Sequence, residues 1–334
     1  MKALLEDPRA PFRAWISIAG FTAIFVAIGT GVMVGAVNVS AQDIWTSFVT
    51  QTGGESYQII QNIRFPRVLV GALVGMNLSL AGCILQGVLR NPLADPGIIG
   101  VSAGAGLAAM LVMILWPSQT AFLPAAAFLG ALLALGAVFT FSWDRGIHPL
   151  RLVLAGVAVA AFFGGGISAL MVFYSDKIQG TVNWMVGGFQ GRSWDHVNLI
   201  LPYSIVGVLG TMVGYRHLNT LQLGDEVAKG LGTRVEVSRT LLVLLAALLA
   251  ASAVSVAGLL GFVGLIVPHI TRIMVGSDFE YLLPCSALFG ATLVVTADTV
   301  ARTAFSPVEV PVGIFMAFLG APYFLYLLRK GIGK

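Results

Sequence analysis

The stretch from Gln86 to Ala105 reads QGVLRNPLADPGIIGVSAGA, a polar, proline-punctuated segment inside an otherwise apolar chain. Pro92 and Pro96 lack a backbone N–H donor and disfavour a helical conformation in the residue before them. The apolar helix that arrives at Leu89 is therefore predicted to end there, and a new helix is predicted to begin at 96–98. Hydrophobic packing alone does not require such a loop, so we expect it to be a functional element.

The composition around this loop indicates an integral membrane protein. The chain has 334 residues, of which 57% are hydrophobic and 10% charged, and its mean hydropathy is +0.90. So few charges cannot solvate the surface of a globular protein of this size. Apolar runs of about 20 residues, the length that crosses a bilayer, are predicted at ten places: 14–37, 68–89, 98–116, 121–142, 151–173, 199–215, 237–257, 259–275, 282–301 and 311–328. We expect one all-α transmembrane domain over residues 1–334, with about ten spanning helices; nine is the alternative, because the seventh and eighth runs are poorly separated.

The distribution of basic residues predicts the orientation in the membrane. An even number of spans puts both termini on one side, and fourteen of the nineteen Lys and Arg residues then fall on the side of the termini. Because Lys and Arg are enriched in cytoplasmic connections, both termini are predicted to be cytoplasmic in a multi-pass protein of the cell (inner) membrane. The net charge of +4 reflects this bias, and the chain carries no basic stripe that would bind nucleic acid.

No catalytic or metal-binding motif occurs in the sequence. The phosphate-binding pattern G-x-x-x-x-G-K-[ST] is missing, so the chain is not predicted to hydrolyse ATP or to act as an enzyme. The four His residues fall in separate connections, and Cys83 and Cys285 lie singly inside apolar runs, so no metal, cofactor or disulfide is expected. Asp298 is the one acidic residue that could carry protons within a span, but Arg302 four residues on favours an ion pair. Asn77 is interpreted either as a helix–helix hydrogen bond or as part of a transport path.

The polar loop resembles that of a known family. RNPLADPGIIGVSAGA at 90–105 is similar to the signature loop of the FecCD-type permeases, the membrane subunits of ATP-driven importers for ferric siderophores, haem and vitamin B12. GFVGLIVPHITR at 261–272 and GAPYFLYLL at 320–328 resemble further segments of the same permeases. The resemblance is clearest from Ile63 onward, and it implies the permease fold of a type II ABC importer.

A polar connection at 221–235, LQLGDEVAKGLGTRV, is predicted to hold a short helix between Gly224 and Gly230 on the cytoplasmic side. In the resembled family this connection forms a coupling helix that sits in a groove of the ATP-binding subunit, a helix-in-groove contact. The resemblance therefore implies a set of residues that couple the chain to ATP hydrolysis: Leu223, Gly224, Asp225, Glu226, Val227, Lys229 and Leu231. Within this set the leucines and valine, spaced four residues apart, are the expected apolar anchors.

The resemblance also implies a gate and a docking surface. The cytoplasmic gate of the transport path is expected to consist of four residues in two loops: Asn91, Leu93, Pro149 and Leu150. Three outward-facing arginines are expected to contact acidic residues on the two lobes of a solute-binding protein: Arg64, Arg67 and Arg302. Anchoring to lipid headgroups is the alternative role for these arginines.

Together these features predict the permease subunit of an ATP-driven importer that translocates a ferric siderophore delivered by a solute-binding protein. The implied partners are two ATP-binding subunits, the solute-binding protein, the lipid bilayer and a second permease copy, either identical or a close paralogue. The pattern W-x-x-G-G-F-x-G-x-x-W at 184–194 is more similar to siderophore and cobalamin permeases than to haem permeases. Haem or cobalamin is an alternative cargo, and an ion-coupled secondary transporter is the alternative from another class.

Overall fold

The computed structural model describes residues 9–35, 39–49, 54–143 and 148–330, and these residues form helices joined by short connections. One helix corresponds to each of the ten predicted apolar runs: α1 (Ala10–Met33), α4 (Phe65–Leu89), α5 (Val101–Leu115), α6 (Leu123–Ser142), α7 (Pro149–Phe173), α9 (Trp194–Gln222), α11 (Val235–Ala257), α12 (Val263–Val275), α13 (Phe279–Thr303) and α14 (Val312–Lys330). Among the described residues, seven helices are long and apolar enough to cross a membrane, and α5, α12 and α14 are shorter apolar helices. The prediction of an all-α membrane protein is confirmed.

Shorter elements connect these helices. At one end of the molecule, α2 (Ala41–Val49), α3 (Gly54–Gln58) and the π-helical η2 (Ile59–Arg64) lead into α4. The other short elements lie in later connections: η3 (Pro96–Ile99), η4 (Pro117–Phe122), η5 (Ser175–Lys177), α8 (Gln179–Val186) and α10 (Asp225–Gly230). The helix predicted over 259–275 begins later than expected, at Val263. Gly258 (φ 74°) and Phe262 (φ 68°) have positive φ angles, and this break separates α11 from α12.

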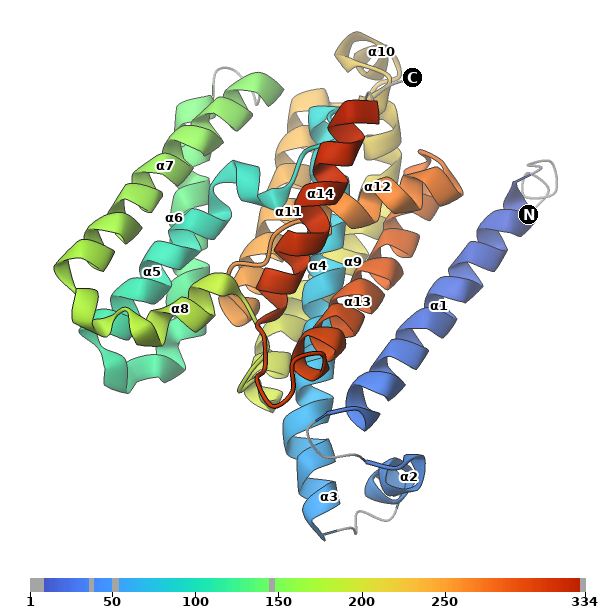
Figure 1. Ribbon diagram of the computed structural model, residues 1–334. Coiled ribbons are helices and arrows are strands. Elements are labelled where there is room, and N and C mark those ends of the chain that lie inside the picture. Colours follow the sequence, from blue (N-terminus) through green and yellow to red (C-terminus); the bar gives the residue numbers. More distant parts are fainter. Residues whose placement is uncertain (1–8, 36–38, 50–53, 144–147, 331–334) are drawn as a thin grey trace.

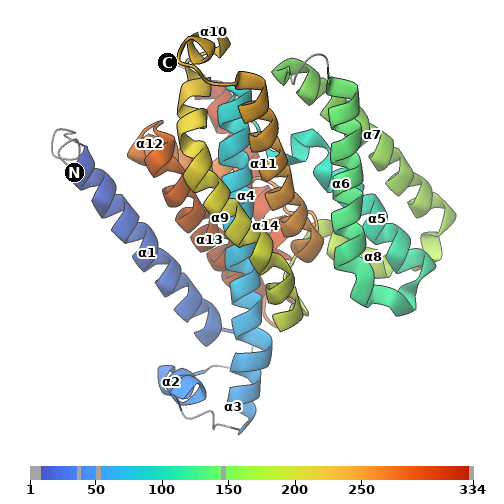
Figure 2. The same cartoon turned by 180° about the vertical axis from the view of Figure 1, so that it is seen from behind.

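Helix α4 forms the centre of the molecule and packs against α9, α11, α12 and α13 (Figures 1 and 2). Two glycines permit this close approach. A Cβ atom added at Gly82 would lie 2.0 Å from the carbonyl oxygen of Gly264 on α12, and one at Gly75 would lie 2.2 Å from the carbonyl oxygen of Gly290 on α13. Small residues let the backbones of membrane helices come into contact in this way.

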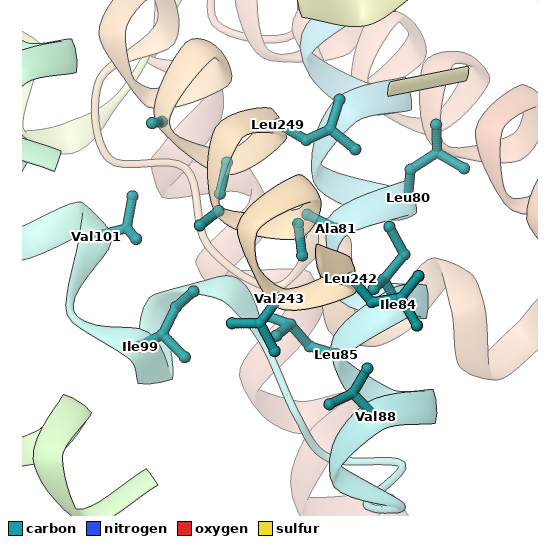
Figure 3. Close-up of a cluster of buried hydrophobic side chains, with 14 of the residues drawn as sticks. Leu80, Ala81, Ile84, Leu85, Val88, Ile99, Val101, Leu242, Val243 and Leu249 are labelled. Atoms are coloured by element: carbon teal, nitrogen blue, oxygen red, sulfur yellow. The ribbon is translucent and has the colours of Figure 1, made fainter. Parts of the chain in front are cut away.

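One cluster of buried apolar side chains lies between α4 and α11 and extends to η3 and the start of α5 (Figure 3). Its members include Leu80, Ile84, Leu85 and Val88 from α4, Leu242, Val243 and Leu249 from α11, and Ile99 and Val101. Asn77, also on α4, donates from Nδ2 to Ser252 Oγ on α11 at 3.2 Å and is buried. The structure therefore supports the helix–helix interpretation of Asn77.

The remaining helices form two flanks. Helices α5, α6, α7 and α8 gather on one side of α4, and α1 lies on the other side, where it packs against α13 (Figures 1 and 2). The first described turn of α1, the last turn of α14 and the short helix α10 lie at one end of the molecule, whereas α2 and α3 lie at the opposite end. We call these the α10 end and the α2 end.

Candidate functional site

The polar loop after α4 is shaped by local hydrogen bonds. Helix α4 ends at Leu89 as predicted, and Arg90 turns the chain through a left-handed conformation (φ 50°). The Asn91 side chain accepts a hydrogen bond from the Leu93 N–H (3.0 Å), and Asp95 accepts one from the Gly97 N–H (2.8 Å) and caps η3. Short Asn and Asp side chains favour turns because they reach the backbone two residues on. A helix begins at Pro96 as expected, but it is a single 3₁₀ turn, and the longer α5 follows only from Val101.

Gln86 holds this loop against α12. Its Nε2 donates to the carbonyl of Gly264 (3.2 Å) and, at longer range, to that of Ala94 (3.5 Å), while its Oε1 accepts from Arg272 Nη1 (3.0 Å). Sequence reasoning did not assign Gln86 a role, although a polar amide in the last turn of an apolar run is a detectable signal. A cavity of about 230 Å³ lies beside this junction and is lined by the loop and by residues 259–261 and Gly264.

The four predicted gate residues lie at the α10 end. Asn91 and Leu93 follow α4, and Pro149 and Leu150 form the first turn of α7. Helix α7 contacts both α4 and η3, so the two loops belong to neighbouring elements. Leu150 is 71% exposed in the single chain, which leaves it able to contact another subunit.

The connection at 221–235, predicted to hold a short helix, does hold one. Helix α10 occupies Asp225–Gly230, and Gly224 enters it with φ 100°, a backbone conformation that favours glycine. Three large apolar side chains in the connection are more than half exposed: Leu223 (58%), Val227 (51%) and Leu231 (62%). Glu226 and Lys229 are exposed as well. Exposed apolar side chains on a protruding connection are typical of a surface that binds a partner.

Asp225 instead contacts its own chain. Its Oδ1 accepts a hydrogen bond from Arg239 Nη2 on α11 (2.8 Å) and lies 3.5 Å from Arg90 Nη2 at the end of α4. Arg239 is 1% exposed, and its charge is paired with Asp225 and, at 3.6 Å, with Glu236. Burial by itself raises the pKa of Asp225, but the hydrogen bond and charge of Arg239, with the charge of Arg90, more than offset it, and the pKa lies below its usual value. Asp225 thus anchors α10, and sequence reasoning missed both arginines because they are distant in the chain.

The three arginines predicted to face outward lie near the α2 end but turn into the chain. Arg64 is 5% exposed and donates from Nη1 to the carbonyls of Val32 and Met33, both at 2.9 Å. These carbonyls belong to the last turn of α1, where helix geometry leaves backbone oxygens without an intrahelical partner. Arg302 is 8% exposed and contacts the carbonyl of Gly31.

Arg67 forms the most extensive of these contacts. Its Nε and Nη2 donate to the two carboxylate oxygens of Asp298, each at 2.9 Å, and its Nη1 donates to Glu309 at 2.9 Å. The predicted pair between Asp298 and Arg302 is present, but at 3.9 Å it is the weaker contact. Nearby carboxylates and helix-end carbonyls thus bind all three guanidinium groups within the chain, and their docking to a solute-binding protein stays a prediction. Within the described ranges, no three His, Cys, Asp or Glu side chains lie together as a metal site would require.

Comparisons with known proteins show which proteins the chain is similar to. A sequence model of the FecCD transport family matches residues 22–330. The Fe(3+)-citrate import system permease protein YfmE of Bacillus subtilis is 37% identical over 98% of this chain and 98% of its own. The hemin transport system permease protein HmuU of Yersinia pestis is 40% identical over 92% of each chain. A solved structure described as an inward-facing conformation of a metal-chelate type ABC transporter is 31% identical and superposes with a TM-score of 0.85 over 95% of this chain and all of its own.

Proposed function

The chain belongs to the FecCD transport family and is the permease of an ABC importer of the metal-chelate, siderophore, haem and vitamin B12 type, and from this premise we propose that its cargo is a ferric siderophore delivered by a solute-binding protein. Relatives named for ferric citrate and for hemin match nearly the whole chain at similar identity, so family membership does not select between these cargoes. The Gly- and Trp-rich pattern at 184–194 favours a siderophore over haem.

The exposed apolar side chains in and beside α10 are the observation that carries the ATP-driven mechanism. Leu223, Val227 and Leu231 are exposed, while Asp225 fixes the helix to α4 and α11. A rigidly anchored helix with an exposed apolar face suits a groove in another protein. We propose that one ATP-binding subunit holds α10 of each permease copy, and that Glu226 and Lys229 contact the rim of that groove.

The positions of the chain ends support an orientation. Both described ends of the chain lie at the α10 end (Figures 1 and 2). If α10 contacts ATP-binding subunits, this end and both termini are cytoplasmic, the protein lies in the cell membrane, and the solute-binding protein docks at the α2 end. The gate residues Asn91, Leu93, Pro149 and Leu150 then lie at the cytoplasmic mouth of the path.

A second permease copy fits the exposed face of α7. Large apolar side chains along this helix are more than half exposed: Leu150, Leu154, Val157, Phe162, Val172 and Phe173. We propose that part of this face contacts the second copy, with the transport path at the interface. The rival ion-coupled mechanism would use Asp298, but that carboxylate is bound by two N–H groups of Arg67 and is poorly suited to carry protons.

Reconstituted transport tests the proposal. The permease, co-purified with its ATP-binding subunit and placed in proteoliposomes with the solute-binding protein, should take up a ferric siderophore only when ATP is supplied. A hydrolysis-deficient ATP-binding subunit is the control. Uptake of haem or cobalamin but of no ferric siderophore would show that the proposed cargo is wrong. Uptake driven by a proton gradient without the ATP-binding subunit would contradict the ATP-driven mechanism and support the ion-coupled one.

A further inference from the structure

The short helix α2 turns apolar side chains outward and a polar one inward. Trp45 and Val49, four residues apart on one face of the helix, are 69% and 59% exposed. Ser47, about 200° around the helix from Trp45, is 1% exposed. A helix at a water-covered surface has the reverse arrangement, with its apolar side chains toward the core. The outer face of α2 therefore suits surroundings that are partly apolar.

The rest of the chain holds α2 in this orientation. The helix contacts α3 and η2, and Ile44 packs against a cluster of buried side chains from α1, η2, α4 and α13. The N–H of Asp43 donates to Ser40 Oγ (3.1 Å), and the N–H of Ser40 donates to Asp43 Oδ2 (2.9 Å), so the two residues cap the first turn. The outward face cannot turn toward the core without the loss of these contacts.

Helix α2 also lies at the level where a bilayer around α1 ends. The 24 residues of α1 extend about 36 Å, slightly more than the ~30 Å thickness of a hydrocarbon core. Trp15, near the beginning of α1, is 70% exposed, and Trp45 follows soon after the opposite end of that helix. Trp is enriched at both membrane–water interfaces because its ring is amphipathic. The two side chains therefore lie where the two interfaces are expected.

The direction of α2 fits the plane of a membrane surface. In Figures 1 and 2 α2 is seen nearly end-on while α4 runs along the picture, so α2 lies across the direction of the central helix. It lies near the end of α1, on the flank away from α7. Along α1, Phe21, Phe25 and Val26 are more than half exposed. Exposed apolar side chains thus extend from the side of a membrane-spanning helix to α2.

We propose that α2 is an interfacial helix that lies in the headgroup region of the leaflet at the α2 end, with Trp45 and Val49 inserted toward the acyl chains. Its sequence, AQDIWTSFV, contains no Lys or Arg, so insertion needs no anionic lipid. Because α2 contacts α3 and η2, which lead into α4, insertion ties one end of the central helix to the membrane surface. This inference depends neither on the cargo nor on the energy source of transport.

Site-directed spin labelling of the full-length permease in phosphatidylcholine nanodiscs tests the inference. Cys83 and Cys285, both buried, are replaced beforehand, and a nitroxide is attached to a single cysteine introduced at Trp45 or at Val49. Oxygen concentrates in lipid and a polar nickel chelate stays in water, so the ratio of their effects on spin relaxation reports the surroundings of the label. We expect oxygen to relax both labels about two-fold or more as strongly as the nickel chelate. Addition of anionic lipid should leave this ratio unchanged.

Two positions of matched exposure are the controls. Leu133 on α6 is 69% exposed, like Trp45, and lies inside a candidate membrane span, so a label there should respond mainly to oxygen. Leu223 beside α10 is 58% exposed, like Val49, and should respond mainly to the nickel chelate in the permease alone. If the label at Trp45 prevents folding, the label at Val49 decides the question by itself.

Labels on α2 that the nickel chelate relaxes as strongly as the label at Leu223 overturn the inference. If the solute-binding protein covers this face instead, the labels will respond to the nickel chelate in nanodiscs and become protected only when that protein is added, which also overturns it. Failure of the proposed function is separately visible, because a loss of ATP-driven uptake of a ferric siderophore leaves these accessibilities unchanged.

Discussion

Asp225 shows how one side chain can determine which surface of a short helix is available to a partner. It binds Arg239 at 2.8 Å and approaches Arg90 at 3.5 Å, and Arg90 directly precedes Asn91 of the predicted gate. A displacement of α10 would therefore reach the polar loop through the ion pair between Asp225 and Arg90. Because the folded pKa of Asp225 lies below the unfolded value of about 3.9, the contribution of these pairs is present above that pH and is lost as the pH falls through the folded pKa. We expect coupling to persist at about pH 5.

Asp225→Asn should uncouple ATP hydrolysis from transport. The substitution keeps the shape but removes the charge that pairs with Arg239, and it should loosen the attachment of α10 by about 1 kcal/mol, a value discounted for the partly exposed carboxylate. We expect the variant to co-purify with the ATP-binding subunit and hydrolyse ATP, with less cargo taken up per ATP. Asp176→Asn, which removes an exposed carboxylate on η5 outside the coupling connection, is the control. An unchanged ratio of uptake to hydrolysis in Asp225→Asn would contradict this link.

Arg67 offers a way to separate stability from docking. Arg67→Gln leaves Asp298 buried without its main partner, which should destabilise the protein by about 3–5 kcal/mol and lower its melting temperature in detergent. The double variant with Asp298→Asn removes both charges and should recover most of the loss. If Arg67 also contacts the solute-binding protein, the double variant will be stable yet dock that protein more slowly. Normal docking by a stable double variant would show that Arg67 is purely structural.

At the scale of the elements, the sequence predicted those features that depend on residues close together in the chain. The end of α4 at Leu89, the position of α10 and the ten apolar helices all follow from proline, glycine and hydrophobic runs. Contacts between distant segments could not be predicted in the same way. The burial of Arg64 depends on the end of α1, and the contact of Gln86 with α12 depends on a break in the chain at 258–262. One sequence contains no signal that pairs such positions.

Helix α4 can approach α12 because Gly82 has no side chain. An added Cβ would lie 2.0 Å from the Gly264 carbonyl, which is backbone and cannot rotate away. Gly82→Ala should therefore cost at least the about 1–3 kcal/mol typical of overpacking and reduce the yield of folded protein in size-exclusion chromatography. Gly136→Ala on α6 is the control, since nothing lies within 4 Å of a Cβ added there. Equal melting temperatures for the two variants would mean that the helices separate without cost.

At the scale of the whole molecule, the two ends differ in chemistry. The α10 end carries an exposed apolar helix and the predicted gate loops, whereas Arg67, Asp298 and Glu309 form a charged cluster near the α2 end. This polarity fits a permease with ATP-binding subunits on one side and a solute-binding protein on the other. The single chain leaves the large apolar side chains of α7 uncovered, and lipid or a second copy is needed to cover them.

The gate prediction concerns the assembly of two permease copies. Asn91 holds the backbone of Leu93 in a turn. Leu93 is half-buried at the α10 end of the molecule, where Leu150 is exposed. If two copies bring their loops together at the cytoplasmic mouth, cysteines introduced at Leu93 of each copy will be joined by a short, cleavable crosslinker. Cys83 and Cys285, both buried, are replaced beforehand so that only position 93 reacts. We expect crosslinking to reduce ATP-dependent uptake in proteoliposomes to background and reductive cleavage to restore it, because the loops must separate for cargo to leave. Full uptake by a completely crosslinked complex would show that these loops do not close the path.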